Sequence, residues 1–329
     1  MRDVAALAQV SAMTVSRVLH DDPRVTALTK QRVLAAVDEL GYRRDETARN
    51  LRLGRGTGLI GLVVTNLANP FYSQLALGVG EVADELGINV VLANSAEDPA
   101  REARLVDDLI SRRVDGIIVV PAGDDHRHLD PVKLHQVPVV LAARPPSGVE
   151  ADCVLVDDFG GTREAVRLLI ARGHTKIAFL GLPPSAYTGA ERYSGFRAAM
   201  TEAGLPVDDA YVHYQTRDIT AAEQAATNLL ALPDPPTALF AANNRNTIGA
   251  IRAINNTGAG TELVGFDDFE LADMLGLPLT VVAYDPGEVG QHAANLLIDR
   301  LRGKGDAAPA QRIVLPTKVV EYLGHPKRQ

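Results

Sequence analysis

The amino-acid sequence predicts an all-α head followed by an α/β body that is built from two parallel-sheet lobes. Two patterns support this fold class. Up to residue 42 the apolar residues recur at helical spacing, whereas after residue 58 apolar runs of strand length alternate with helical segments. The body holds roughly eight or more strand-like runs, which suit two lobes better than one sheet. A chain of 329 residues has room for two or three such units.

The head starts with two helical patterns that are separated by a very short connection. They cover residues 3–9 and 10–19, and Ser11 is the predicted N-cap of the second. Their inward-facing apolar residues are expected to be Val4, Leu7, Ala8, Val15, Val18 and Leu19. The opposite face of the second helix carries small or hydrogen-bonding groups and could enter a groove. Taken alone, this pattern equally fits an ordinary amphipathic surface helix.

A third helix is predicted over residues 27–40, with Thr26 as its N-cap and Gly41 as its stop. Its inner face is expected to carry Val33, Leu34 and Val37. A polar loop, residues 20–24, separates the second helix from the third. Three short helices in this order make a helix-turn-helix unit, in which residues 10–19 form the second helix.

The charges of the chain are unevenly distributed. The formal net charge is −8, which by itself is unusual for a nucleic-acid-binding protein. Residues 1–57, however, hold ten Arg or Lys and seven Asp or Glu, a net charge of +3, so the remainder carries −11. We therefore predict a small basic module on a large acidic body.

The sequence also predicts a compartment. It contains neither an apolar run of membrane-spanning length nor a charged-then-apolar leader. The single cysteine, Cys153, cannot form an internal disulfide and lies in an apolar run, so we interpret it as a buried thiol of the core. These features predict a cytoplasmic protein without membrane association.

Four stretches of the head stand in an order that is typical of one family. They are Asp3-Val4-Ala5, Val10-Ser11-x-x-Thr14-Val15-Ser16-Arg17-Val18-Leu19, Arg32-Val33-Leu34-Ala35-Ala36 and Leu40-Gly41-Tyr42. In this order they resemble the DNA-binding head of the lactose-repressor/galactose-repressor (LacI/GalR) family. One departure is Gln9, where the family usually has Gly. If this site needs a positive φ, a side chain there costs up to roughly 1 kcal/mol.

The resemblance implies a set of DNA-contacting residues. Ala12, Met13 and Arg17 occupy the positions that read base edges in the major groove. The implied set as a whole is Ala12, Met13, Thr14, Ser16, Arg17, His20, Arg24, Tyr42 and Leu51. The chemistry of Arg17 agrees, because a guanidinium can pair with guanine through two hydrogen bonds. For Thr14 and Ser16 the alternative is a solvated helix face.

After the head, residues 45–53 read as a short helix, which the resemblance identifies as a hinge helix. Leu51 matches the leucine that wedges open a base step in the minor groove. The alternative is a linker helix that packs on its own domain. The predicted domains are thus 1–44 for DNA binding, 45–57 for the hinge helix and linker, and 58–329 for effector binding and dimerisation.

The body shows a βαβ rhythm, which predicts parallel sheets that are covered by helices on both faces. The expected strands are 60–64, 89–93, 116–120, 137–141, 153–156, 176–180, 238–241 and 263–266. The helical patterns between them include 71–86, 101–112, 161–171 and 193–203.

Six stretches of the body extend the resemblance. They are Leu67-Ala68-Asn69-Pro70-Phe71-Tyr72, Arg112-Arg113-Val114-Asp115-Gly116-Ile117, Gly173-His174-x-x-Ile177-Ala178-Phe179, Gly195-Phe196-Arg197, Phe240-Ala241-Ala242-Asn243 and Val264-Gly265-Phe266-Asp267-Asp268. The family implies a body that is similar to periplasmic sugar-binding proteins. Lobe 1 would comprise about 58–156 and 286–315, and lobe 2 about 157–285 and 316–329. Three crossovers near Asp157, Asp285 and Leu315 would join the lobes around a ligand cleft.

The resemblance also implies the residues that bind an effector in the cleft. They are Phe71, Tyr72, Arg192, Asn243, Asp267 and Tyr284, the last of which stands where Gln is frequent. For Asp267 the alternative is a loop cap after a strand, and Asn69 and Pro70 are better explained as the turn that starts a helix. Two departures, Ala143 and Asn244 where the family often has Asp, change the anchors for a sugar. We expect a carbohydrate-like or otherwise polar effector, with anionic and modified molecules among the candidates.

Taken together, these patterns predict a transcription regulator, in the main interpretation a repressor. A homodimer would bind a pseudo-palindromic operator on double-stranded DNA, and a sugar or sugar derivative would control its affinity. A corepressor-dependent regulator of the purine type is the alternative.

Two other classes fit less well. A solute-binding protein would need an export signal, and an α/β enzyme would need a catalytic motif such as Gly-x-Ser-x-Gly, which the sequence lacks. His174 precedes a strand and is interpreted as structural. We predict no catalytic residue, no cofactor and no metal site.

Overall fold

The computed structural model describes residues 1–19, 21–42, 56–184, 186–214, 216, 218–303 and 309–323. The chain separates into two compact units, residues 1–57 and residues 58–329. In its described residues the first unit, the head, contains three helices, α1 (Arg2–Leu7), α2 (Ala12–Leu19) and α3 (Ala27–Glu39). Both predicted N-caps are in place. The Ser11 hydroxyl accepts a hydrogen bond from the Thr14 backbone N–H at 3.1 Å, and Thr26 accepts one from the Thr29 N–H.

The core of the head differs in part from the sequence prediction. Its buried members are Val4, Ala5, Ala8, Val15, Val18, Val33 and Ala36. Leu7 and Leu34, which were expected inside, are exposed. The reason is helix geometry, because successive residues are rotated by about 100° around the axis. Once Val33 and Ala36 face inward, the neighbouring Leu34 must turn away, and small alanines let the three helices approach closely.

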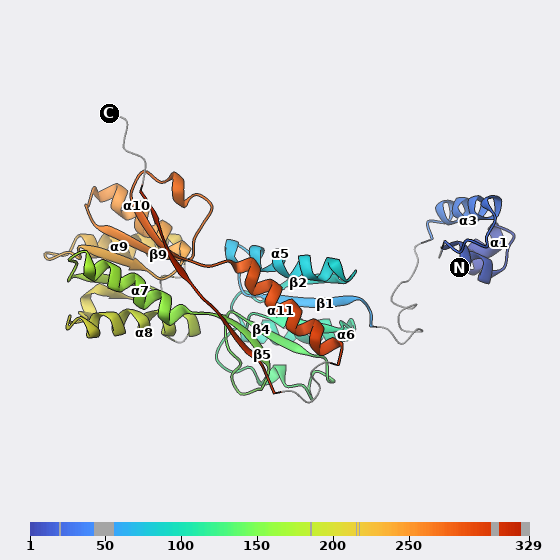
Figure 1. Cartoon of the computed structure of the whole chain (residues 1–329), viewed down its shortest axis with the longest axis horizontal. Helices are drawn as coiled ribbons and strands as arrows, with labels where there is room; N and C mark the ends of the chain where they lie inside the picture. Colours follow the sequence, from blue (N-terminus) through green and yellow to red (C-terminus); the bar gives the residue numbers. More distant parts are fainter. Residues whose placement is uncertain are drawn as a thin grey trace. The chain divides into compact units, whose positions relative to one another are not determined.

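The second unit, the body, contains two six-stranded sheets (Figure 1). Sheet A has the strand order β11 (Arg312–Leu315), β5 (Asp152–Val156), β4 (Val139–Ala142), β3 (Gly116–Val119), β1 (Leu59–Val64) and β2 (Asn89–Asn94). Sheet B has the order β12 (Lys318–Tyr322), β10 (Leu279–Ala283), β9 (Glu262–Phe266), β8 (Ala238–Ala241), β6 (Ile177–Leu180) and β7 (Val212–His213). The pairings are parallel except that of β10 with β12. The predicted α/β class is confirmed.

Helices cover both faces of each sheet. On sheet A, α5 (Pro70–Glu85) and α11 (Pro286–Leu301) pack on one face and α6 (Pro99–Ser111) on the other. On sheet B, α7 (Asp158–Ala171) and α8 (Tyr187–Glu202) face α9 (Ile219–Leu230) and α10 (Asn244–Thr257) across the strands. The short turns η1 (Arg127–Leu129), η2 (Asp209–Tyr211) and η3 (Ala272–Met274) complete the described elements. Among these, no helix is both long and apolar enough to cross a membrane.

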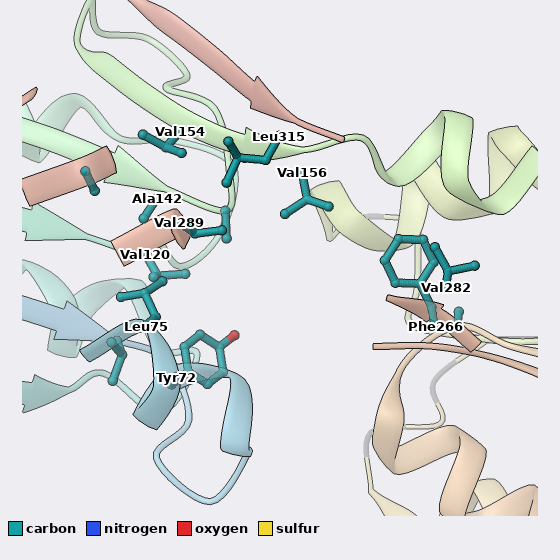
Figure 2. Close-up of a cluster of buried hydrophobic side chains, with 14 of the residues drawn as sticks. Tyr72, Leu75, Val120, Ala142, Val154, Val156, Phe266, Val282, Val289 and Leu315 are labelled. Atoms are coloured by element: carbon teal, nitrogen blue, oxygen red, sulfur yellow. The ribbon is translucent and has the colours of Figure 1, made fainter. Parts of the chain in front are cut away.

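Each sheet and its helices form one lobe, and three connections join the lobes. The chain leaves sheet A after β5, returns from β10 into α11, and passes from β11 into β12. Apolar side chains line these connections. In the view of Figure 2, Val156 at the end of β5 lies between Leu315 of lobe 1 and Phe266 and Val282 of lobe 2, and all four belong to one buried cluster.

Four strands have no counterpart in the predicted set, for two physical reasons. β7 has two residues, and β11 and β12 are partly exposed at sheet edges, so their hydrophobic pattern is weak. β10 is fully buried, but the sequence does not mark it as a separate strand. It follows a short turn, and its apolar run merges with the proline-containing segments on either side. Cys153 lies buried in the core of lobe 1, as predicted, and burial raises the pKa of its thiol.

Two glycines let α5 and α11 approach each other closely in lobe 1. A Cβ on Gly78 would lie 2.1 Å from the Gly287 carbonyl oxygen, and one on Gly290 would lie 2.1 Å from that of Leu75. Gly80, on the same helix as Gly78, has no atom within 4 Å of its Cβ position. We expect Gly78→Ala to lower the free energy of unfolding by about 1–3 kcal/mol through overpacking.

The matched control is Gly80→Ala, which should raise the same quantity by about 0.5–1 kcal/mol because alanine favours a helix. Urea unfolding of the full chain, followed by circular dichroism, measures both. Equal effects of the two substitutions would contradict the close approach.

Gln9, between α1 and α2, has a φ of 50°, in the left-handed region that favours glycine. Gln9→Gly should therefore stabilise the head by up to roughly 1 kcal/mol, and Gln9→Ala should not. This is measured by amide hydrogen exchange of the full chain, in which the amides of α1 and α2 should exchange more slowly in the glycine variant than in the wild type. No difference between the two variants would mean that this backbone conformation is unstrained.

Candidate functional site

The predicted DNA-binding face of α2 lies on the surface of the head. Ala12, Met13 and Arg17 are exposed, and Met13 is 65% exposed despite its apolar side chain. Thr14 and Ser16 are half-buried, and the Thr14 hydroxyl lies 2.9 Å from that of Ser11. Since Val15 and Val18 anchor the opposite side in the core, α2 presents these five residues outward from a rigid base.

The other predicted DNA-contacting residues differ in their surroundings. Arg24 is exposed, and its guanidinium binds both carboxylate oxygens of Asp22 at 2.9 and 2.7 Å. This hydrogen bonding lowers the pKa of Asp22. Tyr42 is half-buried against the core of the head, and its N–H donates to the Val37 carbonyl. His20, Leu51 and the predicted hinge helix at 45–53 lie outside the described residues.

A cavity of about 340 Å³ lies in the body between the two lobes. It is lined from lobe 1 by the start of α5 and the loops after β1 and β4, and from lobe 2 by residues near the ends of β8 and β9. All six residues that the sequence predicts for effector binding line it, namely Phe71, Tyr72, Arg192, Asn243, Asp267 and Tyr284. The position agrees with the rule that ligands lie outside the carboxyl ends of parallel strands.

Arg192, from α8, forms the charged centre of the cavity wall in lobe 2. Its Nε donates to Asp158 at 2.7 Å, and its terminal nitrogens lie 3.2 and 3.4 Å from the Asp267 carboxylate. The Ala242 carbonyl accepts a further hydrogen bond at 2.5 Å. The guanidinium also stacks on the Phe266 ring, 3.6 Å from its centroid. Every side of this buried cation is therefore engaged.

Burial dominates the electrostatics of this group. It raises the pKa of Asp158 to about 6, although the charge of Arg192 opposes the shift. Burial also acts against the charge of Arg192, but the carboxylates of Asp267 and Asp158 outweigh it, so the pKa of the guanidinium is raised. The ion pairs with Arg192 thus offset part of the cost of burying two carboxylates away from water.

Asp267 follows β9 with a φ of 66°, an unusual conformation for a residue other than glycine. Besides its ion pair with Arg192, its carboxylate accepts a hydrogen bond from the Tyr284 hydroxyl at 2.9 Å. Burial, together with the charge of Asp267, raises the pKa of Tyr284 well above its ordinary value. Phe71 contacts Tyr284 and Tyr72 edge to face, so one wall of the cavity is aromatic.

Lobe 1 contributes a second ion pair that the sequence did not predict. Both terminal nitrogens of Arg144 bind the Glu97 carboxylate, at 2.8 and 2.7 Å, and one also donates to the Pro121 carbonyl. Burial disfavours the charge of Arg144, yet the Glu97 hydrogen bond and the negative charges nearby together outweigh burial and raise the pKa of the guanidinium. Ala143, which replaces the usual Asp, lines the cavity with a φ of 62°.

One hydrogen bond spans the two lobes at the edge of the cavity. The Asn244 side-chain amide donates to the Asn69 side-chain oxygen at 2.9 Å. The same oxygen caps α5 by accepting from the Phe71 N–H, so Asn69 does start a helix, as the sequence indicates. Asn69 also lines the cavity, a second role that the local sequence does not reveal.

Several polar residues of the cavity have no counterpart among the predicted ones. They are Asn66, Asn69, Glu97, Arg144, Asp158, Thr188 and Arg245. Arg144 and Arg245 stand directly beside positions where the sequence departs from the family, and that was the available signal. Glu97 and Asp158 carry no such signal, because their partners lie 47 and 34 residues away in the chain.

Two further groups bear on chemistry. His174 bonds to Glu262 and Thr237 at 2.8 and 2.9 Å, which agrees with the structural role expected from sequence. Within the described ranges, no group of three or more His, Cys, Asp or Glu side chains is placed to hold a metal ion.

Comparisons with known proteins match both units. Residues 1–45 match the family described as bacterial regulatory proteins, lacI family, and residues 57–321 match that of periplasmic binding proteins and sugar binding domain of LacI family. The ribose operon repressor of Escherichia coli (strain K12) is 33% identical over 307 residues, 92% of each chain. The transcriptional regulator CelR–cellobiose complex is 32% identical, with a TM-score of 0.74 over 98% of each chain. The lac repressor dimer bound to operator and the anti-inducer ONPF is 28% identical, with a TM-score of 0.82 over 97% of each chain.

The Arg192 cluster leads to a stability prediction. Arg192→Met keeps much of the side-chain volume but leaves Asp158 and Asp267 without their cation, so the free energy of unfolding should fall by about 3–5 kcal/mol near neutral pH. The loss should shrink as the pH falls toward about 5. Without Arg192 the buried Asp158 takes up a proton at a higher pH than in the unfolded chain, and this favours the folded state in acid.

Urea unfolding between about pH 8 and pH 5 measures both effects. Arg163→Met is the matched control, because Arg163 is partly exposed and lies 3.8 Å from Glu202. Its effect should stay below about 1 kcal/mol. A loss for Arg192→Met that equals the control, or that grows in acid, would contradict the assigned network.

Proposed function

The chain belongs to the LacI family of bacterial regulatory proteins, and from this premise we propose that it is a transcription repressor whose operator affinity is set by a small polar effector in the interlobe cavity. One observation supports this proposal above others. A cavity of about 340 Å³ between two lobes collects all six predicted effector residues in a chain that also carries a helix-turn-helix head. A DNA-reading unit and a ligand cavity in one chain are the two parts that ligand-controlled regulation requires.

The head supplies the DNA-binding surface. Arg17, exposed on α2, is the residue best suited to direct base readout, because it can form two hydrogen bonds to guanine. Ala12 and Met13 offer only apolar contacts, which suit a thymine methyl group. Two heads of a homodimer would bind a pseudo-palindromic site in the cytoplasm. The related lac repressor has been solved as a dimer bound to operator.

The cavity supplies the control. Because its lining comes from both lobes, an effector contacts both and favours the lobe arrangement that it fits best. Only this difference in affinity between arrangements can change operator binding, and such couplings are typically about 1–3 kcal/mol. A polar ligand suits the lining of arginines, carboxylates and amides, and Phe71 can cover an apolar sugar face.

The test begins with selection of DNA sites from a random duplex library by the full-length chain. Gel shifts with the selected site then compare the wild type with Arg17→Ala, which should weaken specific binding about 5- to 150-fold and relax the preference at one base pair. Arg112→Ala, a change at an exposed, ion-paired residue of the body, should leave binding unchanged.

The outcomes are distinct. Recovery of a palindromic consensus supports the repressor, and release or tightening by added sugars or purines separates an inducer from a corepressor. If the library yields no consensus at low salt, the chain is not a sequence-specific regulator. If a sugar binds without any effect on DNA, a solute-binding role becomes the better account.

A further inference from the structure

The charged residues that line the cavity differ in whether they have an ion-pair partner. Three carboxylates line it, and each is bound by a neighbour. Arg144 holds Glu97, and Arg192 holds both Asp158 and Asp267. These two arginines are therefore neutralised inside the protein and offer little attraction to a charged ligand.

Arg245 is different. It lines the same cavity and is half-buried, yet its side chain makes no hydrogen bond or ion pair with any residue that the structure describes. It is the second residue of α10, directly after Asn244. The positive end of the helix dipole lies at this same turn and adds to the positive potential at the cavity wall. The three carboxylates and three arginines of the lining balance one another in number, because Asp158 and Asp267 share Arg192. None of these carboxylates is bonded to Arg245, so the positive charge at its part of the wall is local and unpaired.

We propose that the cleft takes an anionic carbohydrate, a sugar that carries a carboxylate or a phosphate group, and that Arg245 binds the anion. The inference rests on the proposed function and names the chemical class of its effector. The two remaining walls suit the rest of such a molecule. Phe71 and Tyr284 offer an aromatic surface for the sugar ring, while Asn243 and Asp267 offer hydrogen-bonding groups to hydroxyls.

A neutral sugar fits this arrangement less well. It would further desolvate the Arg245 guanidinium when the cleft fills, without supplying a charge in return. An anion instead forms charge-assisted hydrogen bonds, which are about twice as strong as neutral ones. Arg245 is thus the residue that would distinguish a sugar acid or sugar phosphate from its neutral parent.

The test is calorimetric titration of the full chain with matched ligands. The neutral probes are D-glucose and D-ribose, the carboxylates are D-gluconate and D-glucuronate, and the phosphates are D-glucose 6-phosphate and D-ribose 5-phosphate. We expect at least one anion to bind about tenfold or more tightly than its neutral parent. The carboxylate and phosphate arms then show which anion the cleft accepts.

Two variants locate the effect. Arg245→Gln should remove most of the preference for the anion while affinity for the neutral parent changes little. Arg252→Gln is the matched control, because Arg252 lies on the same helix but is exposed and paired with Glu223. Added sodium chloride should weaken anion binding in the wild type more than in Arg245→Gln.

The inference is overturned if the neutral sugars bind as tightly as the anions, if no anion binds at millimolar concentration, or if Arg245→Gln keeps the preference. Gel shifts with the same proteins keep this result apart from the proposed function. Operator binding that responds to a neutral sugar leaves the repressor in place and rejects only the anionic ligand. Loss of all specific DNA binding rejects the repressor, whatever the titrations show.

Discussion

The buried guanidinium of Arg192 holds the lobe 2 wall of the cavity together, because it bonds to groups at the ends of three separate chain segments. Asp158 begins α7 directly after the first connection between the lobes, Ala242 follows β8, and Asp267 follows β9. These residues are far apart in the chain but adjacent in space, since parallel strands end at the same edge of a sheet. A cation at this edge therefore fixes several loops of lobe 2 at once.

Once the lobe 2 wall of the cavity is formed, both lobes can contact one ligand. Lobe 1 faces it with its own neutralised pair, Arg144 and Glu97, and with the aromatic side chains at the start of α5. The hydrogen bond between Asn69 and Asn244 is modest by itself, about 1 kcal/mol for a typical pair. A contact of this strength can stabilise one lobe arrangement without locking it, which suits a body whose arrangement a ligand must be able to change.

The predicted residues of the cleft come together because the sequence shows where the strands lie along the chain, and because the family motifs stand at the carboxyl ends of these strands. Asp267 directly follows one predicted strand, and Asn243 lies two residues after the end of another. Their placement therefore follows from the βαβ pattern and the family resemblance. The charge pairing of the cleft does not follow in this way. Glu97 and Asp158 look like ordinary loop and helix-start residues, and only folding brings them within 3 Å of an arginine.

Local signals in the chain settled the caps of α2 and α3 and the alternation of strands and helices, because each depends on neighbours within one or two turns. Tertiary packing decided the rest. It turned Leu7 and Leu34 outward in favour of small alanines. Among the residues that the structure describes, it gave the side chains of Arg144 and Arg192 a partner but not that of Arg245. Burial and ion pairing depend on distances between segments that are remote in the chain, and no local pattern encodes these distances.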